Sequence, residues 1–300
     1  MLRPDFLAIG HVTKDIQEEG YIIGGAVTYS SLTARSLGVR TAVVTRTSPD
    51  LDLGLFRGIE VLRLPSTATT TFQNLYHGEI REQCIRAIAD KIEAEDILPE
   101  WKDAKIVYLA PLAGELDESI AGLFPHSLVG VSPQGWMRCW NGNGRVLPKI
   151  WEGADKVLPR AGVVIFSDED VDGDEELIQS YAQMANILVV TRGSRGATVY
   201  HRGEVRHFPA FETVEVDPTG AGDVFAAAYL IELERSSDPY RAARFANCVA
   251  SFVVERPGTK GIPTPEQVEQ RLTAGKTRFY NVGSSRGTNP PSARRRRERP

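Results

Sequence analysis

The most informative segment of this chain is Asp217-Pro218-Thr219-Gly220-Ala221-Gly222-Asp223, which runs into the apolar residues 224–230. Its small residues leave the backbone bare, so N–H groups at the start of a helix can point at phosphate oxygens, where the helix dipole favours negative charge. Asp223 falls in the first turn, where it can accept the proton of a hydroxyl that attacks phosphorus. An ordinary glycine-rich turn from strand to helix would have the same pattern.

A second motif lies near the N-terminus, where an apolar run at residues 6–10 precedes Asp15. Gly24 and Gly25 then open a helical pattern over residues 26–37. Together with the D-P-T-G-A-G-D-x-F run, this arrangement resembles the ribokinase-like, or PfkB, carbohydrate kinase family over about residues 5–275. The resemblance implies that Asp15 holds acceptor hydroxyls and that the Gly24-Gly25 pair lets a sugar lie against the backbone.

The distribution of apolar residues predicts an α/β protein. Short apolar runs alternate with longer helical patterns, as expected of parallel strands joined by crossover helices, and most predicted strands are followed by a candidate helix. The central strands are predicted at residues 6–9, 41–45, 106–109, 128–131, 163–166 and 187–191. The resemblance implies a three-layer α/β/α fold with a mainly parallel central sheet, and we expect one kinase domain over residues 1–276.

Two stretches depart from the buried-strand pattern. Residues 59–64 alternate between apolar and polar, and residues 69–76 with 79–85 predict a hairpin that turns at His77-Gly78. In the family that this chain resembles, such strands form a small lid over the sugar, and its closure excludes water. We therefore expect lid strands within about residues 15–24 and 59–85, with an ordinary surface hairpin as the alternative.

The donor side of the site is predicted in the second half of the chain. Thr191, Gly193 and Gly196 follow an apolar strand, and small residues at the carboxyl end of a strand allow a ligand to approach the backbone. A tight turn into a hairpin over residues 197–207 explains the same residues. The resemblance further implies an adenine pocket between Asn247, on a predicted helix, and the loop that carries Gly258; packing within the fold is the alternative role for Asn247.

Magnesium is expected because phosphoryl transfer leaves charge on oxygens that need a divalent partner. The family's Asn-x-x-Glu element corresponds here to Ser167-Asp168-Glu169-Asp170, so Asp170 is the candidate to bind the metal through water, with Asp168 and Glu169 as alternatives. These acidic residues also suit the N-terminal cap of a helix. The resemblance adds a possible monovalent cation site at Asp217 and nearby loop carbonyls.

The acceptor is predicted to be a small uncharged polyol or sugar. Tyr29 stands where the family often has asparagine, and no basic cluster that would suit a phosphorylated substrate accompanies the glycine pair. The segment Ser132-Pro133-Gln134-Gly135-Trp136-Met137-Arg138 resembles a P-Q-G-x-x-R variant of some family members, which would place Gln134 and Arg138 near the acceptor; a plain Pro-Gly turn is the alternative. These features favour an inositol-kinase-like enzyme, with a nucleoside kinase as the alternative.

Composition and charge agree with a globular enzyme. The chain has 300 residues, of which 42% are hydrophobic and 25% are charged, and its net charge of −4 gives no reason to expect that the body of the protein binds nucleic acid.

The sequence contains neither a membrane-spanning apolar run nor a signal-peptide pattern, so we expect a cytoplasmic protein that binds no membrane. A monomer or a homodimer is expected. Three unpaired cysteines indicate neither disulfides nor a zinc site. Residues 277–300 are predicted to be a disordered basic tail.

The motifs together assign roles to the site. We expect Asp223 to act as the base, Asp15 and Gly25 to orient the acceptor, and the bare backbone around Gly220, Ala221 and Gly222 to stabilise the transferring phosphoryl group, with N–H donors from Ala221 to Asp223. Because Tyr29 and the segment 167–170 depart from the family pattern, a catalytically silent sensor of sugars or nucleotides is the competing hypothesis. The intact Asp223 argues against that sensor.

Overall fold

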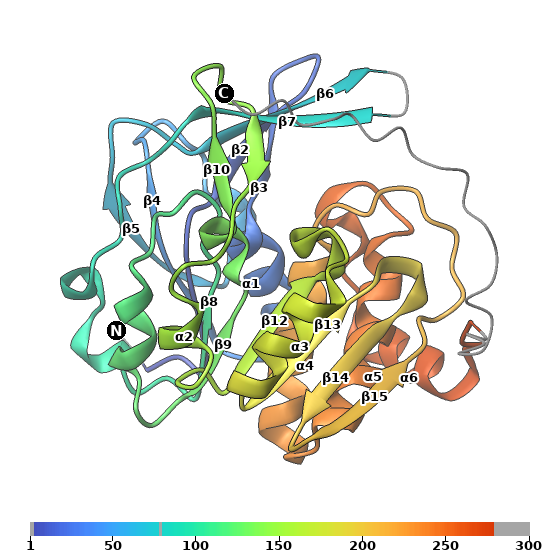
Figure 1. The fold of residues 1–300 in the computed structure, drawn as a ribbon. Coiled ribbons are helices and arrows are strands. Elements are labelled where there is room, and N and C mark those ends of the chain that lie inside the picture. The colour runs from blue at the N-terminus through green and yellow to red at the C-terminus, as the bar shows by residue number, and fades with distance from the viewer. Residues whose placement is uncertain (1–2, 78–79, 279–300) are drawn as a thin grey trace, which may run out of the picture.

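The computed structural model describes residues 3–77 and 80–278 (Figure 1). The predicted basic tail therefore lies outside the described residues from residue 279 onward, and so does Gly78 of the predicted hairpin turn.

The centre of the fold is a nine-stranded sheet in the order β15-β14-β13-β12-β9-β8-β1-β4-β5. Its strands are β1 (Phe6–Ile9), β4 (Thr41–Thr47), β5 (Glu60–Pro65), β8 (Ile106–Leu109), β9 (Leu128–Val131), β12 (Val163–Ser167), β13 (Ile187–Thr191), β14 (Ala197–His201) and β15 (Glu204–Phe208). All neighbours from β5 to β13 pair in parallel, and only the hairpin β14–β15 adds antiparallel strands. The six predicted central strands are confirmed.

Helices cover both faces of this sheet, because alternate residues of each buried strand point to opposite sides. Phe6 and Ala8 of β1 pack with one group of helices, and Leu7 and Ile9 pack with the other. The first group is α1 (Ala26–Ser36), α4 (Ala221–Ser236), α5 (Pro239–Val253) and α6 (Pro265–Ala274), and the second is α2 (Ala154–Val157) and α3 (Glu175–Met184). The predicted three-layer α/β/α architecture is confirmed.

A separate four-stranded sheet, in the order β3-β2-β6-β7, contains the strands predicted for the lid and is called the lid below. Its strands are β2 (Thr13–Ile16), β3 (Tyr21–Gly24), β6 (Thr71–His77) and β7 (Ile80–Ala87), and it lies at the top of Figure 1. The assignment of residues 59–64 to the lid was wrong, since this segment forms β5 at the edge of the central sheet. An edge strand is covered less completely than a central one, which explains its alternating pattern.

Short elements fill several connections that were predicted to hold α-helices. β8 and β9 are followed by the 3-10 helices η4 (Glu118–Leu123) and η5 (Pro133–Trp136), and Gly135 within η5 has a low helix propensity. Next to η5, β10 (Arg138–Trp140) and β11 (Val146–Pro148) form a ribbon that reaches the lid, where the Ile85 N–H of β7 donates to the Gly144 carbonyl at 2.8 Å. The remaining 3-10 helices of the described residues are η1 (Gly54–Phe56), η2 (Ala94–Asp96), η3 (Pro99–Trp101), η6 (Asp168–Val171), η7 (Gly193–Arg195) and η8 (Gly258–Gly261).

None of the helices formed by the described residues has the length and apolar character needed to cross a bilayer.

Candidate active site

The carboxyl ends of β1, β8, β9, β12 and β13 share one edge of the central sheet, because these strands are parallel. Such an edge is where open α/β sheets bind ligands. The motif 217–223 reaches this edge as a tight turn. Asp217 accepts hydrogen bonds from the N–H groups of Thr219 at 3.0 Å and Gly258 at 2.9 Å, and Gly220, with φ 78°, lies immediately before α4.

The backbone N–H groups at the start of α4 are the candidate anion hole. The Ala221 N–H donates to the Pro218 carbonyl at 3.1 Å, a hydrogen bond within the turn itself. The prediction that Ala221 contributes a donor to the phosphoryl group therefore needs correction. The N–H groups of Gly222 and Asp223 find no acceptor within residues 3–77 and 80–278. They remain available to an anionic ligand at the positive end of a helix of 16 residues.

Asp223 lies among polar groups from several other elements. The Tyr108 hydroxyl, on β8, is 3.4 Å from Asp223 Oδ1 and donates to Ser132 Oγ, at the end of β9, at 2.8 Å. Desolvation raises the pKa of the Asp223 carboxyl to about 7, although the residue keeps some exposed surface; Tyr108 and the positive charge of Arg138 lower the pKa, and the carboxylate of Asp170 raises it. A carboxylate with a pKa near 7 suits a general base.

The raised pKa of Asp223 predicts a pH dependence. A base must be deprotonated to accept a proton, so kcat/KM should rise with pH and level off above about 7. Well below that pKa, activity should fall by roughly tenfold for each pH unit, because the fraction of ionised Asp223 falls by that factor. Initial rates between pH 5 and pH 9 would measure the profile; a flat profile across pH 7 would exclude Asp223 as the titrating base.

Replacing Tyr108 should displace this profile. Tyr108→Phe removes a hydrogen bond that lowers the pKa of Asp223, so the midpoint should move upward by about one pH unit. Ser132→Ala is the matched control, since it removes the competing acceptor of the Tyr108 hydroxyl and leaves that hydroxyl free to donate to Asp223. An upward displacement in both variants would show that loss of packing, not the hydrogen bond, is responsible.

The predicted acceptor residues meet where the lid joins the body. Asp15, on β2, receives a hydrogen bond from Thr13 Oγ1 at 3.1 Å, and its carboxylate lies against Gly24, where an added Cβ would collide with it. Gly25, with φ 93°, starts α1, and a Cβ there would lie 2.5 Å from the His11 carbonyl oxygen. Both glycines therefore permit close approaches that place Asp15 at the site.

Tyr29 does not form an exposed wall of the acceptor pocket. Only 2% of its surface is exposed, and its ring lies directly against Gly220. Its hydroxyl is buried and has no hydrogen-bond partner among the described residues. Burial, followed by the charges of Asp15, Asp217 and Asp223, raises the pKa of this tyrosine, so it stays neutral. The ring of Tyr29 thus packs against the glycine turn at Gly220. A contact of its hydroxyl with the acceptor stays a prediction.

The P-Q-G-x-x-R element lies at this site and is more than a plain turn. Gln134 Nε2 donates to Asp170 Oδ1 at 3.2 Å, and Asp170 Oδ2 accepts the Ser167 N–H at 3.0 Å. Arg138 lies close enough for its charge to lower the pKa of Asp223. The structure thus brings Gln134, Arg138 and Asp170 together with Asp223, although they come from separate segments of the chain.

The acidic segment fits magnesium only in part. Asp168 is 6% exposed and pairs with Arg192 and Arg195, so it is already neutralised. No group of three His, Cys, Asp or Glu side chains within the described residues could hold a metal by itself. A Mg²⁺ ion, which keeps several waters, would therefore take phosphate oxygens as ligands, with Asp170 contacting its waters. A monovalent cation at Asp217 stays a prediction.

The predicted donor residues have mixed roles. Thr191, half-buried at the end of β13, is followed by η7 with Gly193 at φ 53°, and Gly196, with φ 98°, lies so close to the Phe208 carbonyl that a side chain would not fit. The prediction that Asn247 contacts adenine is not supported: it is 6% exposed, and its amide nitrogen donates to the carbonyls of Phe208 and Pro209 at 2.9 and 3.3 Å. Its side chain fixes the end of β15.

Sequence reasoning missed Tyr108 and Ser132. Tyr108 is fully buried within an apolar strand pattern, and Ser132 precedes a proline, so neither residue carries a local signal of function. Their role follows from the pairing of β8 with β9, which brings both hydroxyls beneath the first turn of α4.

Comparisons with known proteins agree with this geometry. The profile of the pfkB family carbohydrate kinase matches residues 156–267. A cytidine kinase of Thermococcus kodakarensis is 27% identical over 250 residues, which cover 77% of this chain and 89% of the relative. A pyrophosphate-dependent kinase in the ribokinase family, solved with a pyrophosphate analog and myo-inositol, superimposes with a TM-score of 0.74 at 25% identity, covering 88% of this chain and 99% of the other. A putative ribokinase II from E. coli, solved with ATP and Mg²⁺, shares the fold, with a TM-score of 0.71, 18% identity, and coverage of 91% and 99%.

Proposed function

Because the chain belongs to the ribokinase-like, or PfkB, family of carbohydrate kinases, we propose that it phosphorylates a hydroxyl of a small uncharged polyol or sugar with ATP as the donor. The observation that carries this proposal is the desolvated carboxylate of Asp223 beside the two available N–H groups of Gly222 and Asp223. A base and an anion hole within one helical turn are what transfer of a phosphoryl group to an alcohol needs.

In the proposed mechanism, Asp15 binds a hydroxyl of the acceptor and Asp223 faces the hydroxyl that reacts. Asp223 accepts the proton of that hydroxyl while its oxygen forms a bond to the γ-phosphorus and the bond from this phosphorus to the leaving oxygen breaks. The N–H groups of Gly222 and Asp223 stabilise the charge of the transferring group. The positive charge of Arg138 lowers the pKa of Asp223 and so favours its ionised form.

A putative ribokinase II of this fold was solved with ATP and Mg²⁺, and such an ion would supply charge neutralisation on the donor phosphates. In this chain Asp170 would bind the hydrated ion from its position beside Gln134. Pyrophosphate is the alternative donor, and the similarity to a pyrophosphate-dependent kinase favours testing it. The amide nitrogen of Asn247 already donates to two backbone carbonyls, so a contact to a nucleotide base would have to use its carbonyl oxygen.

The acceptor class follows from the charges at the site. Asp15 and Asp223 are both close enough to Tyr29 for their charges to raise its pKa, and two carboxylates suit hydroxyl groups and repel a phosphorylated acceptor. A nucleoside is the second candidate acceptor, because the cytidine kinase relative matches 77% of this chain.

The test is product formation from Mg²⁺-ATP and from Mg²⁺-pyrophosphate across myo-inositol, other polyols, sugars and nucleosides, with Asp223→Asn in parallel. Turnover of a polyol or sugar that the variant loses would support the proposal. Preferential turnover of nucleosides would show that the acceptor is a nucleoside and would leave the proposed mechanism unchanged. Binding of donor and acceptor without turnover by the wild type would favour the silent sensor.

A further inference from the structure

The chain passes between the central sheet and the lid four times, at residues 10–12, 25, 66–70 and 88–93. His11 lies in the first of these passages, is fully buried, and contacts the other three. Its carbonyl oxygen lies against Gly25, where an added Cβ would be 2.5 Å away. Its ring Nδ1 is 2.7 Å from Thr70 Oγ1, and its ring Nε2 is 3.0 Å from the Asp90 carbonyl oxygen. One buried side chain and its backbone therefore contact every passage between the lid and the body.

The hydrogen bonds of the His11 ring have one consistent direction. The Asp90 carbonyl can only accept, so Nε2 carries the hydrogen, and Nδ1 of the neutral ring accepts from the Thr70 hydroxyl. Thr70 Oγ1 in turn accepts the Ala89 N–H at 3.0 Å. The series begins and ends in the fourth passage and runs through the third and the first, so it ties three passages together.

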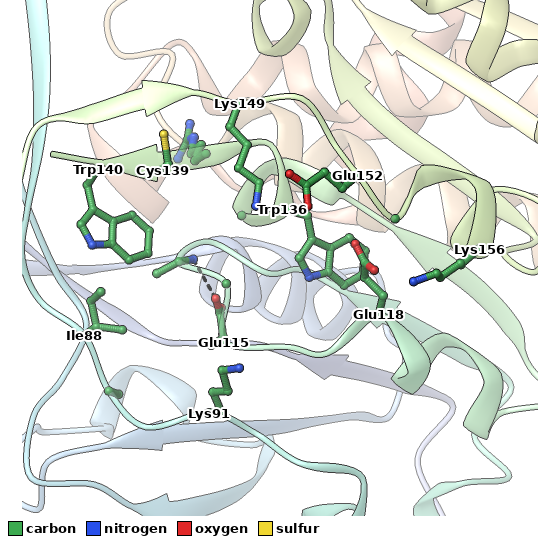
Figure 2. A pocket seen from close by; sticks show the side chains of 16 residues that line it. Ile88, Lys91, Glu115, Glu118, Trp136, Cys139, Trp140, Lys149, Glu152 and Lys156 are labelled. Carbon is green, nitrogen blue, oxygen red and sulfur yellow. Dashed lines mark hydrogen bonds between the residues drawn. The ribbon is translucent and has the colours of Figure 1, made fainter.

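Glu115 ties His11 to the body. This carboxylate is 1% exposed and accepts three backbone N–H groups, among them that of His11 at 3.1 Å. Its own carbonyl oxygen accepts the Ile92 N–H at 2.9 Å, and Figure 2 shows Glu115 beside this fourth passage, which also carries Ile88 and Lys91. Displacing His11 would remove a donor from a buried carboxylate, which is costly. We call His11, Thr70, Asp90 and Glu115 the lid joint.

The lid joint also fixes the strand that carries Asp15. The Lys14 N–H, next to Asp15, donates to the Thr70 carbonyl at 2.9 Å, so Thr70 holds both the His11 ring and the residue before Asp15. Asp223 lies on α4, outside the lid. The position of Asp15 relative to Asp223 therefore depends on how the joint holds the lid.

We propose that His11 is a positioning residue: its hydrogen bonds hold the lid at a fixed place on the body and so place Asp15 opposite Asp223. Hinges in proteins are a few residues at the ends of elements, and His11 occupies such a place between β1 and β2. The effect on the acceptor rests on the proposed function, whereas the joint itself does not.

Three variants of the full chain test this proposal. Thr70→Val nearly keeps the size of the side chain and removes the hydroxyl that donates to His11 and accepts from Ala89. Thr70→Ser keeps that hydroxyl. Thr71→Val is the matched control, because the Thr71 hydroxyl instead donates to the Thr69 carbonyl at 2.8 Å. Thermal unfolding of all three ensures that differences are not a loss of fold.

The first measurement is hydrogen–deuterium exchange without substrates, followed by mass spectrometry in peptides that cover residues 10–16 and 85–92. We expect Thr70→Val to speed exchange there by roughly tenfold, the factor for loss of about one hydrogen bond. Peptides of α4 should exchange as in the wild type. Thr70→Ser and Thr71→Val should match the wild type throughout.

The second measurement separates KM from kcat, with the acceptor that the product-formation test identifies. We expect Thr70→Val to raise KM for the acceptor by roughly fivefold or more, because Asp15 belongs to the lid. KM for the donor should change by less than about twofold, since the N–H groups of Gly222 and Asp223 lie on α4. Thr70→Ser should restore the KM for the acceptor. A smaller amount of folded protein would instead lower kcat and leave both KM values unchanged.

Two results would overturn the proposal. Equal exchange in Thr70→Val and the wild type would show that the joint does not hold the lid. Faster exchange with an unchanged KM for the acceptor, or with equal changes in both KM values, would show that the joint does not position Asp15. If the wild type phosphorylates no acceptor, the proposed function has failed, and the exchange result alone then supports or overturns the joint.

Discussion

Asp223→Asn is expected to lower kcat by at least roughly 10²-fold, the lower range for a general base. Asparagine keeps the size of the side chain but cannot accept the proton of the attacking hydroxyl. It also loses the negative charge that the Arg138 guanidinium stabilises. Binding of the donor should change little, because the backbone N–H groups of the first turn of α4 remain in place. Steady-state rates with the acceptor that the product-formation test identifies, together with calorimetric binding of the donor, measure both quantities.

The Asp223→Asn variant should be at least as stable as the wild type. The carboxylate of Asp223 is desolvated, and a neutral amide removes the cost of holding a charge there. Thermal unfolding therefore separates a catalytic effect from a folding defect. Near-normal turnover in a folded variant would show that another group accepts the proton and would refute the mechanism.

Gly220→Ala should damage both the fold and the activity. Gly220 has φ 78°, which costs an L-residue energy, and an added Cβ would overlap the ring of Tyr29. We expect the free energy of unfolding to fall by roughly 2–5 kcal/mol from the two effects together. Because the glycine turn positions the start of α4, kcat should also fall by at least roughly tenfold at temperatures where the variant is folded. Urea denaturation and initial rates measure the two effects.

Gly222→Ala is the matched control for stability. Gly222 lies two residues further along, within α4, and an added Cβ would meet no atom within 4 Å. Alanine is also the better helix former, so this variant should be as stable as the wild type or more stable. If both alanine variants lose the same stability, the contact of Gly220 with Tyr29 does not explain the effect of Gly220→Ala.

Much of the fold could be predicted because its signals are local. Buried parallel strands are continuous apolar runs, and all six predicted ones lie in the central sheet. The alternating residues 59–64 were misassigned because an edge strand of the main sheet and a half-covered strand of a lid have the same pattern. Only the pairing of β5 with β4 distinguishes the two cases, and that contact is not encoded in the pattern.

The sequence predicted the site residues that are close neighbours in the chain. Asp223 and the glycine turn occupy one short segment, whereas Tyr108 and Ser132 reach Asp223 only through the packing of β8 and β9 beneath α4. The hydrogen bonds of Asn247 likewise depend on where β15 ends, which no local pattern specifies. Contacts that depend on tertiary packing, such as those of Tyr108, Ser132 and the amide nitrogen of Asn247, were therefore not predicted.

The lid carries part of the candidate acceptor site, and this has a consequence for how such enzymes diversify. β2 and β3 leave the central sheet after Gly10 and return at Gly25, and they bring Asp15 with them. The groups proposed for proton and phosphoryl transfer lie elsewhere, on α4 and beneath it. The residues proposed for acceptor recognition and those proposed for transfer chemistry thus lie on separate elements of the fold. A chimera that receives the β2–β3 insertion of a relative should acquire a new acceptor preference while it inherits an unchanged reaction.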